Sequence, residues 1–287
     1  MLGAIIGDMV GSTYEFHPIK TKKFNIFNPN SHMTDDSYLT MAVARALLKH
    51  YPIQYNEEGI KAIKRELINE FVNTWRCFRT AGYGYMFYQW CERAYVTRDV
   101  GPYYSFGNGG AMRISPVGWI ANNEGEVKML SKAVTEITHN HPEALKAAEA
   151  VAMCIYLARN GYSKGQLKKR MVDEYYPEIA FYNFDKLVET CTFSSKSQDS
   201  VPQAIYCFLI SDSEEDAIRN AVALGADSDT QACIAGSIAE AFYQRDKLSE
   251  FEDKYLYLMI DPEVEQLIKE LHDKIGSEKF NKENNNE

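Results

Sequence analysis

Apolar residues recur every three to four positions along most of this 287-residue chain, and that spacing restricts it to helical folds. In residues 35–50, one helical stripe would hold Leu39, Ala42, Val43, Ala46 and Leu47. The same periodicity runs through residues 59–77, 142–159, 214–224 and 231–243. The alternation typical of half-buried strands is not sustained anywhere, and no repeat of solenoid length is present. The sequence therefore predicts a compact all-α protein.

The chain has no composition shift that would divide it into separate domains. We therefore expect one domain over residues 1–275, a length that can bury a sizeable core. Residues 276–287, GSEKFNKENNNE, are polar and predict a disordered tail. Residues 17–33 and the Gly-rich residues 101–118 have the composition of loops.

Charge and cysteine usage exclude several classes of protein. Forty acidic residues against 31 basic ones give a net charge of −9, which argues against generic nucleic-acid binding. The six cysteines form no C-x-x-C pair, so we expect reduced core residues in a cytoplasmic protein. The apolar start MLGAIIGDMVGS has no basic region and is interrupted by Asp8, which predicts neither a signal peptide nor a membrane span.

Two acidic clusters lie at junctions between a loop and a helix. Each combines one threonine with two aspartates: Thr34, Asp35 and Asp36 in the first, and Asp227, Asp229 and Thr230 in the second. Either cluster alone is consistent with acids that favour the partial positive charge of a helix N-terminus. If the two helix starts meet, four carboxylates converge, and repulsion would raise their pKa values. Such hard oxygen ligands suit Mg²⁺, Mn²⁺ or Ca²⁺, and a pair of cations ~3.5–4 Å apart could activate water.

The first helical segment, residues 3–16, carries two further acids. Glycines recur every four residues from Gly3 to Gly11, which predicts a helix packed closely against a neighbour. Asp8 lies within this apolar run and needs a partner if buried; a hydrogen bond to another loop and metal ligation are both open. Glu15 follows the helix, as either a solvated loop acid or a site residue.

The Gly-rich segment SFGNGGAMRIS, residues 105–115, has the character of an anion-binding loop. Its glycines permit close backbone approach, and successive N–H groups before a helix suit a pyrophosphate. It matches neither the phosphate-loop nor the dinucleotide fingerprint. Arg113 would pair with a phosphate or with a core acid. His139 and His141 have no Cys cluster to complete a zinc site, and His139 would be structural unless the fold brings it to the loop.

Four motifs in order resemble the ADP-ribosylglycohydrolase family over roughly residues 3–243: GDMVGSTYE (7–15), TDDS (34–37), SFGNGGAMR (105–113) and GADSDT (225–230). The resemblance implies an orthogonally packed all-α fold with two divalent cations, Mg²⁺ or Mn²⁺. It implies metal ligands at Thr34, Asp35, Asp36, Asp227, Asp229 and Thr230. It implies substrate-binding residues at Ser105, Phe106, Gly107, Asn108, Gly109, Gly110 and His139. The implied catalytic residues are Glu15, Asp35 and Asp229.

Three positions depart from the family pattern without removing a metal-binding oxygen. Ala226 stands where the family has the second glycine of G-G-D-x-D-T, and metal binding should survive if its φ is negative. Gln231 follows the motif where an apolar residue is common, and Ser37 replaces a frequent threonine.

The resemblance implies an enzyme that hydrolyses the N- or O-glycosyl bond linking ADP-ribose to a modified target. Its partner would be an ADP-ribosylated protein or other ADP-ribosylated target, its product ADP-ribose, and no membrane would be involved. The alternatives are a protein that binds ADP-ribose without turnover, a crystallin-like structural protein, or a metal hydrolase of another nucleotide. The linkage stays open: arginine, serine, a nucleic-acid base or a small molecule. Candidates to face the leaving group are Arg79, Tyr83, Tyr85 and Asp99.

Overall fold

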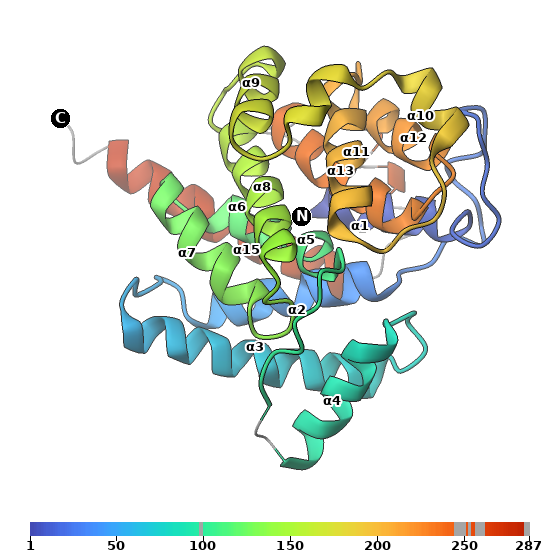
Figure 1. Ribbon diagram of the computed structural model, residues 1–287. Helices are drawn as coiled ribbons and strands as arrows, with labels where there is room; N and C mark the ends of the chain where they lie inside the picture. Colours follow the sequence, from blue (N-terminus) through green and yellow to red (C-terminus); the bar gives the residue numbers. More distant parts are fainter. Residues whose placement is uncertain (98–99, 244–250, 252–253, 256–261, 284–287) are drawn as a thin grey trace.

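The protein is built almost entirely from helices, as Figure 1 shows. The structure, a computed structural model, describes residues 1–97, 100–243, 251, 254–255 and 262–283. Within these ranges there is no β-strand, only an isolated antiparallel bridge between Gly107 and Lys196. The helices are α1 Leu2–Ser12, α2 Asp35–Lys49, α3 Glu57–Cys77, α4 Tyr85–Thr97, α5 Gly109–Met112, α6 Ser115–Ile120, α7 Glu124–Thr135, α8 Pro142–Arg159, α9 Lys164–Glu174, the 3₁₀ helix η1 Pro177–Phe181, α10 Phe184–Thr190, α11 Ser197–Leu209, α12 Glu214–Ala223, α13 Ser228–Tyr243 and α15 Pro262–Glu283. The predicted all-α class is confirmed.

The five periodic segments form α2, α3, α8, α12 and α13, and local signals mark the starts of two of them. The Thr34 side chain accepts a hydrogen bond from the backbone N–H of Asp36 and so caps α2. Helix α8 begins after His141 with a proline in its first turn, where the missing N–H has no intrahelical partner to lose. The predicted apolar stripe of α2 is buried throughout.

Two expectations about irregular segments need correction. Residues 101–118 are not a loop throughout, because α5 and the start of α6 fall within them. Pro116 does not prevent the helix, since it lies in the first turn of α6, where proline is well tolerated. The backbone is helical to Glu283, which includes residues 276–283 of the predicted tail; residues 284–287 lie outside the described residues. Residues 17–33 contain no helix, as predicted.

Helix α13 lies at the centre of the fold, where it packs against α1, α8, α11 and α12. Its contact with α1 is so close that a Cβ on each of three glycines would lie within 2.4 Å of an α13 carbonyl oxygen: Gly3 against Gly236, Gly7 against Ala232 and Gly11 against Ser228. This confirms the packing predicted from the glycine repeat. The pairing runs antiparallel, so the C-terminal end of α1 meets the N-terminal end of α13.

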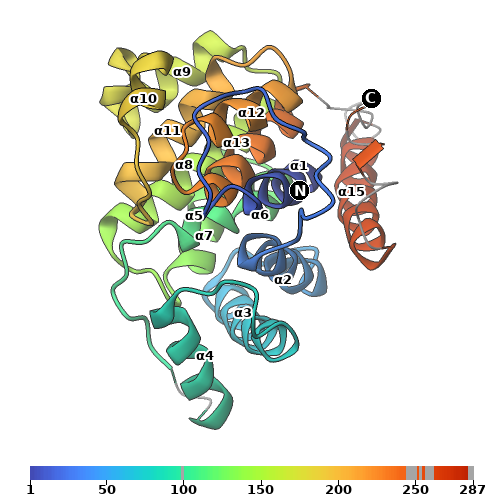
Figure 2. The ribbon, with the colours of Figure 1, turned by 90° about the vertical axis from the view of Figure 1, so that its right-hand side faces the viewer.

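The remaining helices form layers around this pair. Helices α2 and α3 pack on one side of the central helices, and α4 packs outside α3 (Figures 1 and 2). Helix α15 packs against α2 and α6 and stands at the side of the molecule in Figure 2. No helix in the described ranges is long and apolar enough to cross a membrane. The six cysteines, all within those ranges, form no disulfide.

Candidate active site

The start of α2 is held in place by Asp8 of α1. The Asp8 carboxylate accepts hydrogen bonds from the backbone N–H groups of Thr34 (2.8 Å) and Ser37 (3.1 Å). It also accepts the hydroxyl of Thr34 at 2.6 Å and that of Ser37. Asp8 is fully buried, so the expectation that it hydrogen-bonds another segment is confirmed. This contact places the first acidic cluster beside α1.

The two acidic clusters meet, although 194 positions separate Asp36 from Thr230 in the chain. The Thr230 hydroxyl donates to a carboxylate oxygen of Asp36 at 3.3 Å. Carboxylate oxygens of Asp8, Asp36 and Asp229 lie within 4.8 Å of one another, and the same holds for Glu15, Asp227 and Asp229. Asp229 therefore belongs to both groups. The antiparallel crossing of α1 and α13 explains why Glu15, just past α1, joins the aspartates at the start of α13.

Burial and mutual repulsion raise the pKa values of these acids. Loss of solvent is the largest cause, and it holds the pKa values of Asp35, Asp36 and Asp229 well above the usual 3.8, with neighbouring carboxylates adding to the effect. Burial likewise raises the pKa of Asp227 to about 6 and that of Glu15 to about 7. No described lysine, arginine or histidine forms a salt bridge with any of these five residues.

The donor set fits divalent cations. All the converging groups are carboxylates or hydroxyls, the hard oxygen ligands that Mg²⁺ and Mn²⁺ prefer. One oxygen of Asp36 is buried and has no hydrogen-bond partner in the described part of the chain. A bound cation would satisfy that oxygen and compensate the negative charge, as protons do in its absence.

The turn before α13 tolerates the alanine that departs from the family pattern. Gly225 is the residue with a positive φ, 57°, and a Cβ there would lie 2.7 Å from the carbonyl oxygen of Ile19. Ala226 is not among the described non-glycine residues with positive φ, so the condition for replacing the second glycine is met.

The glycine loop before α5 forms the opposite wall of the site. Its backbone is pinned to the segment before α11, because Asn108 N–H donates to Ser195 O at 2.9 Å and Ser197 N–H to Phe106 O at 3.0 Å. The Asn108 side chain donates to Asp227 at 2.7 Å and so links the loop to the acids. The fold brings His139 to the loop, since a Cβ on Gly109 would lie 3.0 Å from its Nε2 atom.

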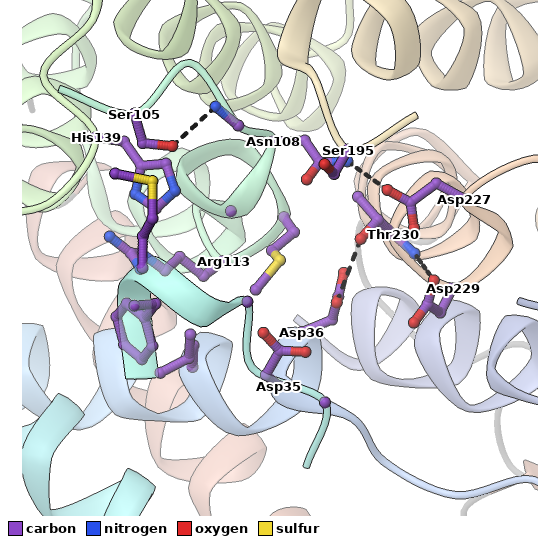
Figure 3. A pocket seen from close by; sticks show the side chains of 18 of the residues that line it. Asp35, Asp36, Ser105, Asn108, Arg113, His139, Ser195, Asp227, Asp229 and Thr230 are labelled. Atoms are coloured by element: carbon purple, nitrogen blue, oxygen red, sulfur yellow. Dashed lines mark hydrogen bonds between the residues drawn. The ribbon is translucent and has the colours of Figure 1, made fainter. Parts of the chain in front are cut away.

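A pocket of about 390 Å³ lies between the acids and the glycine loop. Figure 3 shows Asp227, Asp229 and Thr230 on one side and Ser105 and His139 on the other. The predicted site residues that line it are Glu15, Asp35, Asp36, Ser105, Gly107, Asn108, Gly109, His139, Asp227, Asp229 and Thr230.

Three predicted site residues do not line this pocket. Thr34 is turned to Asp8, to which its hydroxyl donates. Phe106 is 43% exposed and lies edge-on to His141, with ring centroids 5.6 Å apart. Gly110 faces Thr135, where a Cβ would come within 2.5 Å of a methyl carbon, so its small size serves helix packing.

Several lining residues carried no signal in the sequence. Phe193 and Ser195 come from the segment between α10 and α11, which contains no motif. Gly82 and Gly84 come from the segment before α4, and Met86 and Phe87 from its first turn. Among the candidates to face the leaving group, Tyr85 lines the pocket and is 75% exposed. Arg79 instead lies over the ring of Trp75, and Tyr83 stacks on Phe87. Asp99 lies outside the described residues.

Comparison with known proteins agrees with this geometry. Residues 1–279 match the family model described as ADP-ribosylglycohydrolase. The ADP-ribosylhydrolase ARH3 of Homo sapiens is 24% identical over 316 residues, covering 87% of this chain and 86% of that protein. The ADP-ribosylarginine hydrolase Tri1 of Pseudomonas putida (strain GB-1) is 23% identical over 261 residues, covering 85% and 69%. A solved structure titled "ADP-ribosylglycohydrolase-related protein complex" shares the fold, with a TM-score of 0.70, 21% identity and coverage of 96% and 97%.

Proposed function

This chain belongs to the ADP-ribosylglycohydrolase family, and on that premise we propose that it hydrolyses the glycosidic bond between ADP-ribose and a modified target with two divalent cations, Mg²⁺ or Mn²⁺. The observation that carries the proposal is the convergence of five carboxylates on one pocket, where none of them forms a salt bridge with a described residue. A buried acid cluster of this kind destabilises a protein that has no use for it. The cluster is therefore better explained by a ligand than by folding.

The proposed ligands of the cations are the oxygens of both clusters: Thr34, Asp35, Asp36, Asp227, Asp229 and Thr230. Asp229 has the central place among them, because its carboxylate lies close to both Asp36 and Asp227. Asp8 fixes the position of this cluster, because it accepts four hydrogen bonds from Thr34 and Ser37. Divalent cations bound there would lower the pKa of a bound water molecule and act as Lewis acids toward the hydroxyls of the distal ribose.

Glu15 is the proposed general base. It lines the pocket and is only partly buried, and its carboxylate lies within 4.8 Å of those of Asp227 and Asp229, so it can reach a water molecule held at that centre. Its carboxylate would orient a water molecule and accept a proton from it. The water oxygen then attacks the anomeric carbon while the bond to the leaving group breaks, through an oxocarbenium-like transition state. Asp35 and Asp229 are proposed to share in catalysis by holding this centre together.

The glycine loop and His139 are proposed to bind the diphosphate end of the ADP-ribosyl group. Gly107, Gly109 and His139 line the same pocket as the acids. Figure 3 shows His139 on the opposite side of it from Asp227 and Asp229. Glycines here let backbone N–H groups approach phosphate oxygens closely. Ser105 already accepts the N–H of Gly107 at 3.0 Å, which orders the loop before any ligand binds.

Three alternatives have weaker support. A protein that reads ADP-ribose without turnover would need the glycine loop but not the acids, and a crystallin-like structural protein would need neither. A hydrolase of another nucleotide would use the same donor set on a different bond, and only the substrate distinguishes it. The relatives named above are hydrolases of ADP-ribosyl groups by their printed names, which favours the glycosidic bond.

The test is release of free ADP-ribose from substrates carrying the modification on arginine, serine or DNA. Each is incubated with Mg²⁺ or Mn²⁺ and, in parallel, with a chelator. Metal-dependent release from one substrate class would support the proposal and identify the linkage. Binding of free ADP-ribose without release from any substrate would favour the non-catalytic alternative.

A further inference from the structure

Arg113 is a buried cation without an acidic partner. Its side chain is fully buried, and within the described residues it forms no salt bridge. The guanidinium lies over the rings of Phe71, 4.3 Å from the centroid, and Phe87 at 5.7 Å. Of the two partners predicted for Arg113, a core acid is not found among the described residues, and pairing with a phosphate stays a prediction. Its Nε and Nη1 atoms are buried without a hydrogen bond in the described structure.

The one strong hydrogen bond of Arg113 leads toward the pocket. Its Nη2 atom donates to the hydroxyl oxygen of Thr138 at 2.7 Å. The same hydroxyl oxygen lies 2.7 Å from Nδ1 of His139. A chain of contacts thus runs from the buried guanidinium through one hydroxyl to the imidazole that lines the pocket.

The direction of these hydrogen bonds can be deduced from their donors. Arginine only donates, so the Thr138 oxygen accepts from it and keeps one proton to give. The acceptors with a measured contact are Nδ1 of His139 at 2.7 Å and the carbonyl oxygen of Thr135 at 3.4 Å, and the hydroxyl of Tyr103 also lies near. The shorter contact is the better hydrogen bond. A hydroxyl that accepts from a cation is also a stronger donor and a poorer second acceptor. Nδ1 therefore accepts.

We propose that Arg113 and Thr138 are positioning residues that hold His139 in the neutral tautomer with its proton on Nε2, aimed at the glycine loop. Nε2 would be 3.0 Å from a Cβ on Gly109 and 3.7 Å from one on Gly107, so the two glycines leave this atom open to the pocket. The inference rests on the proposed function, since the Nε2–H group would donate to an oxygen of the bound ADP-ribosyl group.

The environment of His139 keeps the ring neutral and in place. Burial, and then the charge of Arg113, hold its pKa well below the usual value, so one ring nitrogen carries a proton at neutral pH. The ring of Tyr103 packs edge-on against it, with centroids 5.5 Å apart. Arg113 also lines the pocket, although its side chain is fully buried, and its hydrogen bond to Thr138 connects it to His139.

The first test reads the tautomer directly and needs no turnover. Long-range ¹H–¹⁵N spectra of the imidazole groups, with His139 assigned by a His139→Gln variant, would show Nδ1 unprotonated and hydrogen-bonded, and Nε2 protonated. In Thr138→Val the Nδ1 signal should move to that of a free nitrogen, and the Nδ1-protonated form should become measurable. Thr138→Ser should restore the wild-type signals. A protonated Nδ1 in the wild type would overturn the proposal.

The second test measures the dissociation constant of free ADP-ribose by calorimetry. Thr138→Val should weaken binding about tenfold, the value of one hydrogen bond to a charged group. Thr135→Val is the matched control, because the Thr135 hydroxyl is buried one turn away and has no hydrogen-bond partner in the described chain. Thr135→Val should change the dissociation constant less than about twofold, as expected of a residue outside the contacts from Arg113 through Thr138 to His139. Equal weakening in both variants would reduce Thr138 to a packing residue.

These outcomes distinguish the positioning of His139 by Arg113 and Thr138 from the proposed function. If His139 has the expected tautomer but no substrate releases ADP-ribose, the proposed hydrolysis is contradicted and the proposed positioning of His139 is not. If hydrolysis occurs while His139 carries its proton on Nδ1, only the proposed positioning is contradicted.

Discussion

Replacing Asp229 by asparagine should abolish metal binding and activity, yet stabilise the metal-free protein. Asp229 is the one residue shared by the two groups of converging carboxylates. Its Oδ1 atom accepts the N–H of Thr230 at 2.9 Å, and an asparagine oxygen can keep that hydrogen bond. The amide group would also be able to donate to a neighbouring carboxylate. The substitution Asp229→Asn therefore removes charge without removing the local structure.

The size of the stabilisation follows from the spacing of the acids. Two unit charges at the 4.8 Å limit of these groups repel by roughly 3 kcal/mol at an effective dielectric constant of about 20. Protonation of the cluster relieves part of that repulsion. At pH 8 without metal we therefore expect Asp229→Asn to raise the free energy of unfolding by about 1–3 kcal/mol. Each kcal/mol corresponds to roughly 2–4 °C in the melting temperature of a large domain. With Mn²⁺ at 100 times its dissociation constant, the free energy of unfolding of the wild type should rise by about 2.7 kcal/mol, and that of the variant should not change.

Thermal unfolding in chelator and in Mn²⁺, together with ADP-ribose release, measures both effects. Asp273→Asn on the exposed surface of α15 is the control and should change neither. We expect Asp229→Asn to lower turnover at least about 10³-fold, as loss of a group central to a charged site does. Near-wild-type turnover, or an unchanged response to Mn²⁺, would refute the metal assignment. A lower melting temperature in chelator would refute the electrostatic argument.

Three further outcomes follow from the same geometry. Glu15→Gln should reduce turnover by about 10²–10⁴-fold while the dissociation constant of free ADP-ribose stays within a fewfold, because a general base acts on water and not on the diphosphate; equal losses in both would make Glu15 a binding residue. The metal-free protein should lose stability as pH rises from about 4 to about 7, since the pKa values of Asp227 (about 6) and Glu15 (about 7) are raised by folding, so the folded state binds more protons in that window. Chemical unfolding at several pH values in chelator measures this slope, and a stability that rises through the window would contradict the raised values. Gly7→Ala should lower the free energy of unfolding by more than about 3 kcal/mol or prevent folding, because its Cβ would lie 2.1 Å from Ala232 O. Gly101→Ala is the control: its Cβ would have nothing within 4 Å, so denaturant unfolding should show a change within about 0.5 kcal/mol.

Local features of the fold were accessible from the sequence because they depend on neighbours three or four residues apart. The periodic stripes predicted α2, α3, α8, α12 and α13, and the acids Asp35 and Asp36 indicated the N-terminus of α2. The glycine repeat of α1 predicted a close helix contact, but it did not say with which helix. The acidic clusters and the glycine loop were each recognisable as short motifs, and their order along the chain pointed to the family.

Only the tertiary structure decided which of these motifs act together. Nothing local in the sequence connects Asp36 with Thr230 or His139 with Gly109, because their contacts depend on how whole helices pack. The antiparallel packing of α1 on α13 brings Glu15 to Asp229, and helix packing places the guanidinium of Arg113 beside Thr138. Residue spacing determines the helices and their caps, since backbone hydrogen bonds are local. The electrostatic properties of the site come from burial and from charges distant in the chain, which exist only once the helices are packed.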